Sequence, residues 1–193
     1  MIIPLFKTSY SIGKSLLRIE DIIDIAQSNK LKKVTLVEDN FYGFRAANSA
    51  FLHADIPMVY GVRIPVFQSE SERSSKLVFF AKNNRGLSNL RNLYSKSKCD
   101  LNLDGYDHFY MEEENNHPFD FQIKEKLKNL NIKTQKTKTI YYRNREDFEA
   151  FQMYKAVCAR KQGKVPTYSK PNLNDFCSDD FCFESYLENN ASI

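Results

Sequence analysis

The sequence has no long run of apolar residues, no internal repeat and no low-complexity tract. Hydrophobic residues make up 42% of the 193 residues, but they occur in short runs, which excludes a membrane-spanning helix and favours a soluble globular protein. The apolar residues at the start are too few for a signal peptide, because Lys7 interrupts them. We therefore expect a cytoplasmic protein with no membrane segment.

The spacing of cysteines that is typical of a metal site is also missing. The four cysteines are scattered, Cys177 and Cys182 are the closest pair, and no histidine lies near them to complete a zinc site. We expect four reduced thiols. The formal net charge of +4 is a mild excess, which suits a nucleic-acid-binding protein as well as many other soluble proteins and so decides nothing alone.

Short apolar runs of strand length alternate with segments of helical periodicity. The strand-like runs are 2–6, 34–37, 58–60, 77–81, 108–111 and 139–142, and the helical patterns cover 19–29, 42–54, 85–97, 120–131 and 145–162. This alternation predicts an α/β domain, although the chain is too short for a standard eightfold barrel of roughly 250 residues.

Residues 32–66 form the central unit of this pattern, a strand, a helix and a second strand. Two parallel strands need such a crossover, so the unit predicts a parallel sheet whose ligand face lies at the carboxyl ends of its strands. Glu38 and Asp39 follow the first strand and Arg63 follows the second, so all three should lie on that face.

Five segments in order resemble the PHP (polymerase and histidinol phosphatase) domain at the N-terminus of the bacterial DNA polymerase III alpha subunit. They are PLFKTSYSIGKSLL, the central unit, LVFFAKNNRGLSNLRNLY, DHFYMEE and IYYRNREDFEAFQMYKAVCARKQGK. The resemblance implies a reduced, distorted βα barrel over residues 1–163. Proline and asparagine interrupt residues 164–193, which should form an irregular C-terminal arm whose aromatic residues nonetheless pack on a surface: Phe181, Phe183 and Tyr186.

Active members of that family hold a cluster of metal ions on His, Asp, Glu and Cys side chains at the strand ends, where the ions activate water for phosphoester hydrolysis. The matching positions here form a vestigial pocket of seven residues: Lys7, Ser9, Glu38, Asp39, Arg63, Thr139 and Tyr141. Lysine and arginine cannot ligate a metal at neutral pH and repel one. We therefore expect no metal, no cofactor and no catalytic residue, with Lys7 or Arg63 paired to Glu38 or Asp39.

Three functions fit these observations. The first is a non-catalytic PHP-like domain of the DNA replication machinery that supports or docks to a polymerase III alpha-type core or another replication protein. The second is a metal-dependent phosphoesterase or 3′–5′ exonuclease with altered ligands, drawn from Glu38, Asp39, Asp107 and His108. The third is a small nucleic-acid-binding module in which Tyr141 and Tyr142 stack on bases beside basic residues, which would bring the chain into contact with DNA.

Overall fold

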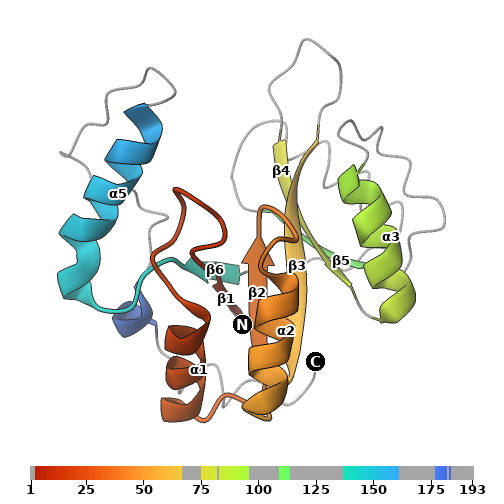
Figure 1. The fold of residues 1–193 in the computed structure, drawn as a ribbon, viewed down its shortest axis with the longest axis horizontal. Helices are drawn as coiled ribbons and strands as arrows, with labels where there is room; N and C mark the ends of the chain where they lie inside the picture. Colours follow the sequence, from red (N-terminus) through yellow and green to blue (C-terminus); the bar gives the residue numbers. More distant parts are fainter. Residues whose placement is uncertain are drawn as a thin grey trace.

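The computed structural model describes residues 3–66, 75–81, 83–95, 109–113, 137–160, 177–181 and 183. They form one sheet with helices packed against it (Figure 1). The strands are β1 (Ile3–Phe6), β2 (Val34–Glu38), β3 (Met58–Val66), β4 (Ser75–Ala81), β5 (Phe109–Glu113) and β6 (Thr137–Ile140). All six strand-like runs of the sequence are therefore strands, and the α/β class is confirmed.

The strand order is β5-β4-β3-β2-β1-β6. Strands β3, β2, β1 and β6 run parallel to one another, as the central unit predicts. The βα barrel pattern is wrong for β4, which pairs antiparallel with both β3 and β5. Only residues 67–74 separate β3 from β4, and a parallel crossover needs a dozen residues or more. Among the described strands β5 and β6 are the edges of an open sheet, and closure into a barrel is not seen.

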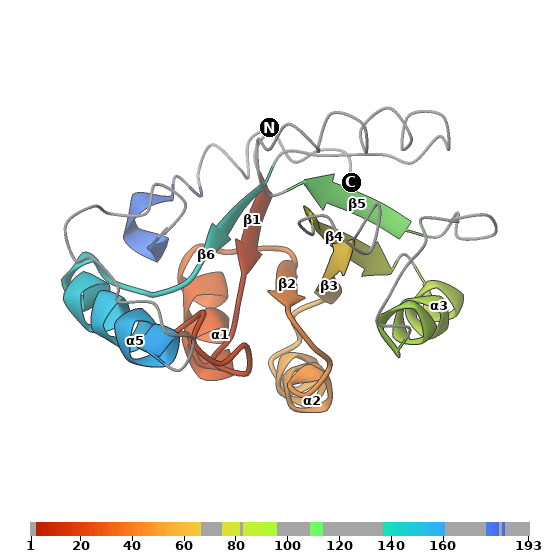
Figure 2. The same cartoon turned by 90° about the horizontal axis from the view of Figure 1, so that it is seen from above.

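The helices are α1 (Ile19–Ser28), α2 (Phe44–His53), α3 (Asn84–Ser95) and α5 (Phe148–Arg160), with short 3-10 turns η1 (Arg145–Asp147) and η2 (Ser178–Asp180). Four of the predicted helices are confirmed, and the fifth, at 120–131, lies outside the described residues. Figure 2 shows α1, α2 and α3 on the same side of the sheet, with α5 beyond β6. No helix among the described residues is long and apolar enough to span a membrane.

Alternation along the strands divides the apolar residues between the two faces of the sheet. Phe6, Leu36 and Val62 point toward the helices and join the main core with Ile22 and Phe51. The opposite face carries a smaller cluster of Leu5, Val37, Val78 and Phe80. This division decides where the polar residues at the strand ends point.

Residues of the predicted C-terminal arm pack against both the sheet edge and the core. Cys177 forms a parallel bridge with Tyr142, just beyond β6. Phe183 is buried, and its ring stacks on Phe6 with 6.4 Å between the ring centroids. Phe181 packs against the same core. The prediction that these aromatics find a surface is confirmed for Phe181 and Phe183, whereas Tyr186 lies outside the described residues.

Candidate functional site: an ion-pair cluster at the strand ends

Three charged residues meet on the face of the sheet that carries the smaller apolar cluster. Lys7, Asp39 and Arg63 each lie two residues beyond a residue on that face, namely Leu5, Val37 and Gly61. Val37 pairs with Gly61 in the parallel ladder, so the next residues on the same face, Asp39 and Arg63, are neighbours across the strands. We call Lys7, Asp39 and Arg63 the ion-pair cluster.

Asp39 accepts from both cations of this cluster. Lys7 Nζ lies 2.7 Å from Asp39 Oδ1, and Arg63 Nη1 lies 3.5 Å from the same oxygen. The side chains of Lys7 and Arg63 are 0% and 7% exposed, whereas that of Asp39 is 32% exposed. The pairing of a cation with an acid, which the sequence predicts, is therefore confirmed, and Asp39 is the part of the cluster that faces solvent.

The pKa values of the cluster follow from burial and from the crowding of the cations. Burial and the nearby charge of Arg63 lower the pKa of Lys7 to about 8, against the attraction of Asp39. Burial alone would raise the pKa of Asp39, but the charges of Lys7, Arg63 and Lys14 lower it below its usual range. Asp39 is thus ionised and has more than one cation to neutralise.

Glu38 lies next to Asp39 in the sequence but turns to the helix-covered side, because side chains alternate along a strand. Its Oε1 accepts from the Thr8 backbone N–H at 2.8 Å and from the Thr8 hydroxyl at 2.5 Å, and its Oε2 accepts from the Ser11 hydroxyl. Burial raises the pKa of Glu38, although these hydrogen bonds oppose the shift. Glu38 therefore holds the β1–α1 loop (residues 7–18) and is not one of a pair of carboxylates in a common pocket.

The other predicted pocket residues lie on or next to β1 and β6, the strands at one end of the sheet. Ser9 is exposed, and its backbone N–H donates to Leu17 O at 2.7 Å. Thr139 is buried within β6 beside Leu5. Tyr141 stacks on Phe151 with 6.0 Å between the ring centroids.

Sequence reasoning missed the hydroxyl groups of the β1–α1 loop. Besides Thr8 and Ser11, Ser15 is buried, and its hydroxyl lies 2.7 Å from Tyr141 O and within hydrogen-bonding distance of Lys7 O. The polar run from Thr8 to Ser11 was the available signal, since such runs at strand ends often hold a loop in place.

The cluster does not fit a metal ion. Among the residues that the structure describes, no three His, Cys, Asp or Glu side chains gather to hold one. The ammonium group of Lys7 and the guanidinium of Arg63 both contact Asp39 Oδ1, so the charge of this carboxylate already balances two cations. Two cations at these positions repel a third. Asp107 and His108, named for the phosphoesterase alternative, lie outside the described residues.

Of the two aromatic residues proposed for nucleic-acid stacking, Tyr142 is buried and Tyr141 is partly buried. Tyr142 is 4% exposed and stacks on Phe151 with 4.8 Å between centroids. Tyr141 and Phe148 pack against the same small cluster. The Tyr142 ring just beyond β6 therefore belongs to the protein interior and is not available to a base.

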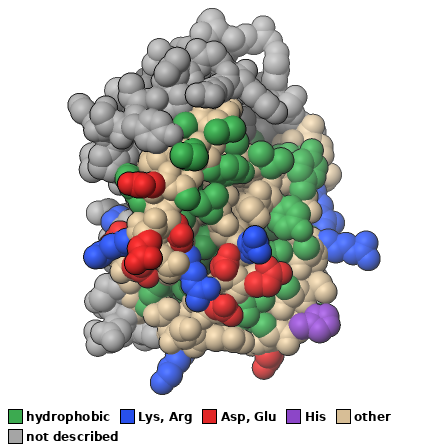
Figure 3. Space-filling view, turned by 60° about the vertical axis from the view of Figure 1, so that its left-hand side comes forward, with side chains coloured by type: hydrophobic (Ala, Val, Ile, Leu, Met, Phe, Trp, Pro, Cys, Tyr) green, Lys and Arg blue, Asp and Glu red, His purple; other side chains and the backbone are tan. Residues whose placement is uncertain are grey.

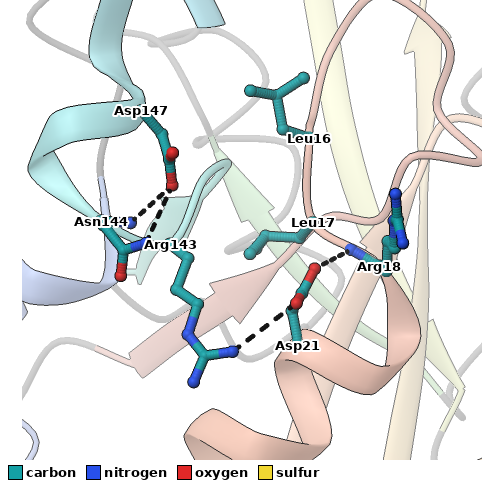
Figure 4. Close-up of a pocket in the computed structure, with 7 residues that line it drawn as sticks. All are labelled: Leu16, Leu17, Arg18, Asp21, Arg143, Asn144 and Asp147. Carbon is teal, nitrogen blue, oxygen red and sulfur yellow. Dashed lines mark hydrogen bonds and ion pairs between the residues drawn. The ribbon is translucent and has the colours of Figure 1, made fainter. Parts of the chain in front are cut away.

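A separate cavity of about 570 Å³ lies between α1 and the start of η1 (Figure 4). Arg143 Nη1 lies 3.6 Å from Asp21 and 3.3 Å from Asp24, while the Asp21 carboxylate also accepts from the Arg18 backbone N–H at 2.9 Å. The Arg143 guanidinium in this cavity is therefore paired with acids of α1. The lining residues are Leu16, Leu17, Arg18, Asp21, Arg143, Asn144 and Asp147.

Parallel strands that alternate with helices, and that carry charged residues at their carboxyl ends, place this chain in the α/β class. A profile of the PHP domain family matches residues 6–172, so the chain belongs to the PHP domain family. No curated protein matches the chain.

Two solved structures show similarity over about half of the chain. An amidohydrolase from Chromobacterium violaceum, solved with bound sulfate and no metal, is 22% identical over 47% of this chain and 32% of its own, with a TM-score of 0.36. A putative metal-dependent phosphoesterase from Bifidobacterium adolescentis is 17% identical over 48% of this chain and 32% of its own, with a TM-score of 0.35. The matched part spans about a third of each of these proteins.

Proposed function

We propose that this chain is a PHP domain without phosphoesterase activity, which supports or docks to a polymerase III alpha-type DNA polymerase. The observation that supports the lack of phosphoesterase activity is the contact of 2.7 Å between Lys7 Nζ and Asp39 Oδ1. A metal-activated water needs several anionic or neutral ligands around one ion. Here a buried lysine and a buried arginine surround the one solvent-facing carboxylate.

The proposed docking to a polymerase is supported by the sequence alone. Five segments in order resemble the PHP domain that precedes the polymerase III alpha core, and they cover most of the chain. A domain whose site is neutralised internally can still contribute a folded surface to a larger assembly. The proposed role is therefore support or docking of a polymerase core.

Two measurements on the purified full chain test the loss of activity. The first is the content of zinc, manganese and iron after dialysis, and the second is hydrolysis of a phosphomonoester and of a single-stranded oligonucleotide with added Mn²⁺. We expect substoichiometric metal and no hydrolysis above that of the Asp39→Asn variant. Tightly bound stoichiometric metal together with hydrolysis that Asp39→Asn abolishes would establish the phosphoesterase alternative instead.

Docking is tested with the polymerase III alpha-type core of the same host, prepared without any PHP segment of its own. We expect the chain to bind this core in analytical ultracentrifugation and to raise its melting temperature. Neither binding nor stabilisation would refute the docking role. Salt-dependent binding of oligothymidine with no binding of the core would favour the nucleic-acid-binding module.

A further inference from the structure

Helix α3 belongs to a stretch of the chain that carries basic residues and no acidic ones. Residues 73–99 contain seven lysines and arginines and no aspartate or glutamate. Within α3 the charged residues are Arg85 and Arg91, and both are exposed. Like charges gathered in one stretch repel one another, so the stretch favours a partner that carries the opposite charge.

The exposed residues of α3 all lie on one side of the helix. At roughly 100° per residue they fall within about 120° of arc, and the buried Gly86, Leu90 and Leu93 lie opposite. In Figures 1 and 2 the helix lies near one end of the sheet, away from α1 and α5. We call its exposed residues the α3 face: Asn84, Arg85, Ser88, Arg91, Asn92 and Ser95.

The two arginines of the α3 face differ from those that follow β6. Residues 126–145 form a second stretch with basic and no acidic residues, but Arg143 and Arg145 pair with acids of α1 and η2. Figure 3, which brings the side of α1 and α5 forward, shows acidic and basic side chains next to one another. None of the ion pairs that the described residues form involves Arg85 or Arg91. Their charge is therefore available to a partner.

The first turn of α2 adds a third exposed arginine close to this face. The Arg91 guanidinium lies over the Phe44 ring, 5.5 Å from its centroid, and Phe41 contacts Tyr94 edge to face with 5.4 Å between centroids. Arg45 follows Phe44 directly and is exposed, and α2 contains no acidic residue.

Two acids lie near the ends of α2, and they do not cancel the charge of the arginines. Asp39, before α2, contacts both Lys7 and Arg63, so its single negative charge already faces two positive ones. Asp55 lies beyond the other end of α2. Positive charges therefore outnumber negative ones on α2, α3 and the described residues that connect β2 to β3.

The side chains of the α3 face are of the types that contact phosphate. Arginine, serine and asparagine donate many of the hydrogen bonds that proteins make to the phosphates of nucleic acids. The α3 face has no apolar side chain, whereas the core of an interface with a protein needs apolar residues. A helix of 12 residues is about 18 Å long, so several phosphates of one strand can lie along it.

An exposed ring beside α3 favours a single strand over a duplex. Tyr42 is 81% exposed. Burial and the nearby Tyr42 hydroxyl raise the pKa of Tyr94 on α3, so Tyr42 lies close to this helix while its ring remains open to solvent. An unpaired base can stack on such a ring, whereas the bases of a duplex stack on one another.

We propose that the α3 face binds the phosphate groups of a single-stranded nucleic acid, with Tyr42 stacking on a base. Arg85 and Arg91 would contact phosphates at two points about 9 Å apart along the helix axis. This site lies outside the ion-pair cluster, and it goes beyond the docking role because it needs no polymerase core.

The test measures the affinity of the purified full chain for labelled oligothymidine between about 50 and about 200 mM salt. Arg85→Gln with Arg91→Gln removes two charges from the α3 face. Its control is Lys30→Gln with Lys32→Gln, which removes two exposed charges from the turn between α1 and β2. Arg85→Gln alone leaves the contact of Arg91 with Phe44 intact, and it serves as the second variant should the double variant fail to fold.

We expect the affinity to fall as salt rises, and the double variant to bind at least about tenfold more weakly at the lowest salt. The slope of log K against the logarithm of the salt concentration should become less steep by about 0.7 for each arginine removed. The lysine control should change the affinity by less than about threefold. Equal losses in the arginine variants and the control would overturn the α3 face, and so would an absence of oligothymidine binding by the natural chain.

Tyr42→Leu and two further probes test the choice of partner. Tyr42→Leu should weaken oligothymidine binding by about tenfold and leave the salt slope unchanged. A duplex of the same length should bind more weakly, and equal or tighter binding of the duplex would overturn the single-stranded partner. Binding of polyglutamate without binding of oligothymidine would assign the face to an acidic protein and overturn nucleic acid. Because no polymerase core is present, failure here leaves the docking role intact.

Discussion

Asp39 is the residue that keeps two buried cations neutralised. Its carboxylate contacts Lys7 and Arg63, which are 0% and 7% exposed, and Asp39 itself is 32% exposed. A buried charge that loses its partner costs several kcal/mol, whereas an exposed one costs little. The stability of this site therefore depends on the acid more than on either cation.

We expect Asp39→Asn to lower the free energy of unfolding by about 2 to 3 kcal/mol at neutral pH, somewhat less than for a fully enclosed pair because Asp39 is 32% exposed. Urea-induced unfolding of the natural chain and of Asp39→Asn measures this difference in free energy. The control is Asp55→Asn, an exposed residue whose change should stay within about 0.5 kcal/mol. Equal losses in the two variants would mean that the cluster is not a buried network.

Lys7 should make the stability of the protein depend on pH. Its pKa is about 8 in the folded chain against 10.5 for an ordinary lysine. Between these pH values the unfolded chain binds a proton that the folded chain lacks, so the free energy of unfolding rises with pH. Lys7→Met removes this contribution.

We therefore expect the stability of the natural chain to rise relative to Lys7→Met as the pH increases from about 8 to about 10, by at most about 3 kcal/mol. Urea unfolding at several pH values gives the difference. The control is Lys32→Met, which changes an exposed lysine. Its free energy of unfolding should change with pH as that of the natural chain does. A constant difference between the natural chain and Lys7→Met would show that the lysine is not shifted.

At the scale of elements, β3 is the strand at which the sheet changes direction. It pairs in parallel with β2 and antiparallel with β4, and Gly61 lies opposite Phe80 in the antiparallel ladder. A Cβ at Gly61 would lie 2.4 Å from the Phe80 ring. The ring thus occupies the space that any side chain on this residue would need.

Gly61→Ala should lower the free energy of unfolding by about 1 to 3 kcal/mol, because the buried ring must move in a packed cluster. A double-mutant cycle with Phe80→Leu gives the internal control, since the smaller side chain leaves room for the new methyl group. Thermal or urea unfolding of the four proteins should show that the two substitutions together cost less than the sum of the single changes. If the free-energy costs of the two substitutions simply add, the close contact between Gly61 and the Phe80 ring is contradicted.

At the scale of the whole molecule, the first and last described segments share one core. Phe183 stacks on Phe6 of β1, and its ring centroid lies 4.8 Å from that of Phe181. Cys177 pairs with Tyr142, and Arg145 Nη2 lies 2.6 Å from Asp180. The described C-terminal residues, 177–181 and 183, therefore pack with the sheet and its core.

Phe183→Ala should cost about 3 to 5 kcal/mol, the range for a buried phenylalanine in a core. Phe181→Ala, at a partly buried ring, should cost less. Both are measured by urea unfolding of the full chain. A loss for Phe183→Ala no greater than that for Phe181→Ala, with unchanged cooperativity, would mean that the C-terminal segment detaches without disturbing the core.

The local sequence pattern was sufficient to predict the strands and helices and part of the candidate site. Apolar runs and helical periodicity placed all six strands and α1, α2, α3 and α5, because these signals depend on neighbours in the chain. The order strand, helix, strand in residues 32–66 also predicted the parallel pairing of β2 with β3. The resemblance to the PHP family pointed to Lys7, Asp39 and Arg63, and their charges alone predicted an ion pair.

The tertiary structure decided the features that depend on contacts between distant segments. The antiparallel pairing of β4, the separation of Glu38 from Asp39 onto opposite faces, and the burial of Tyr142 and Phe183 follow from register and packing. A sequence pattern records which residues alternate or recur, but it does not record which strand lies beside which or which side of the sheet is covered. Those choices are made by long-range packing, and they determined which of the charged residues at the strand ends could meet.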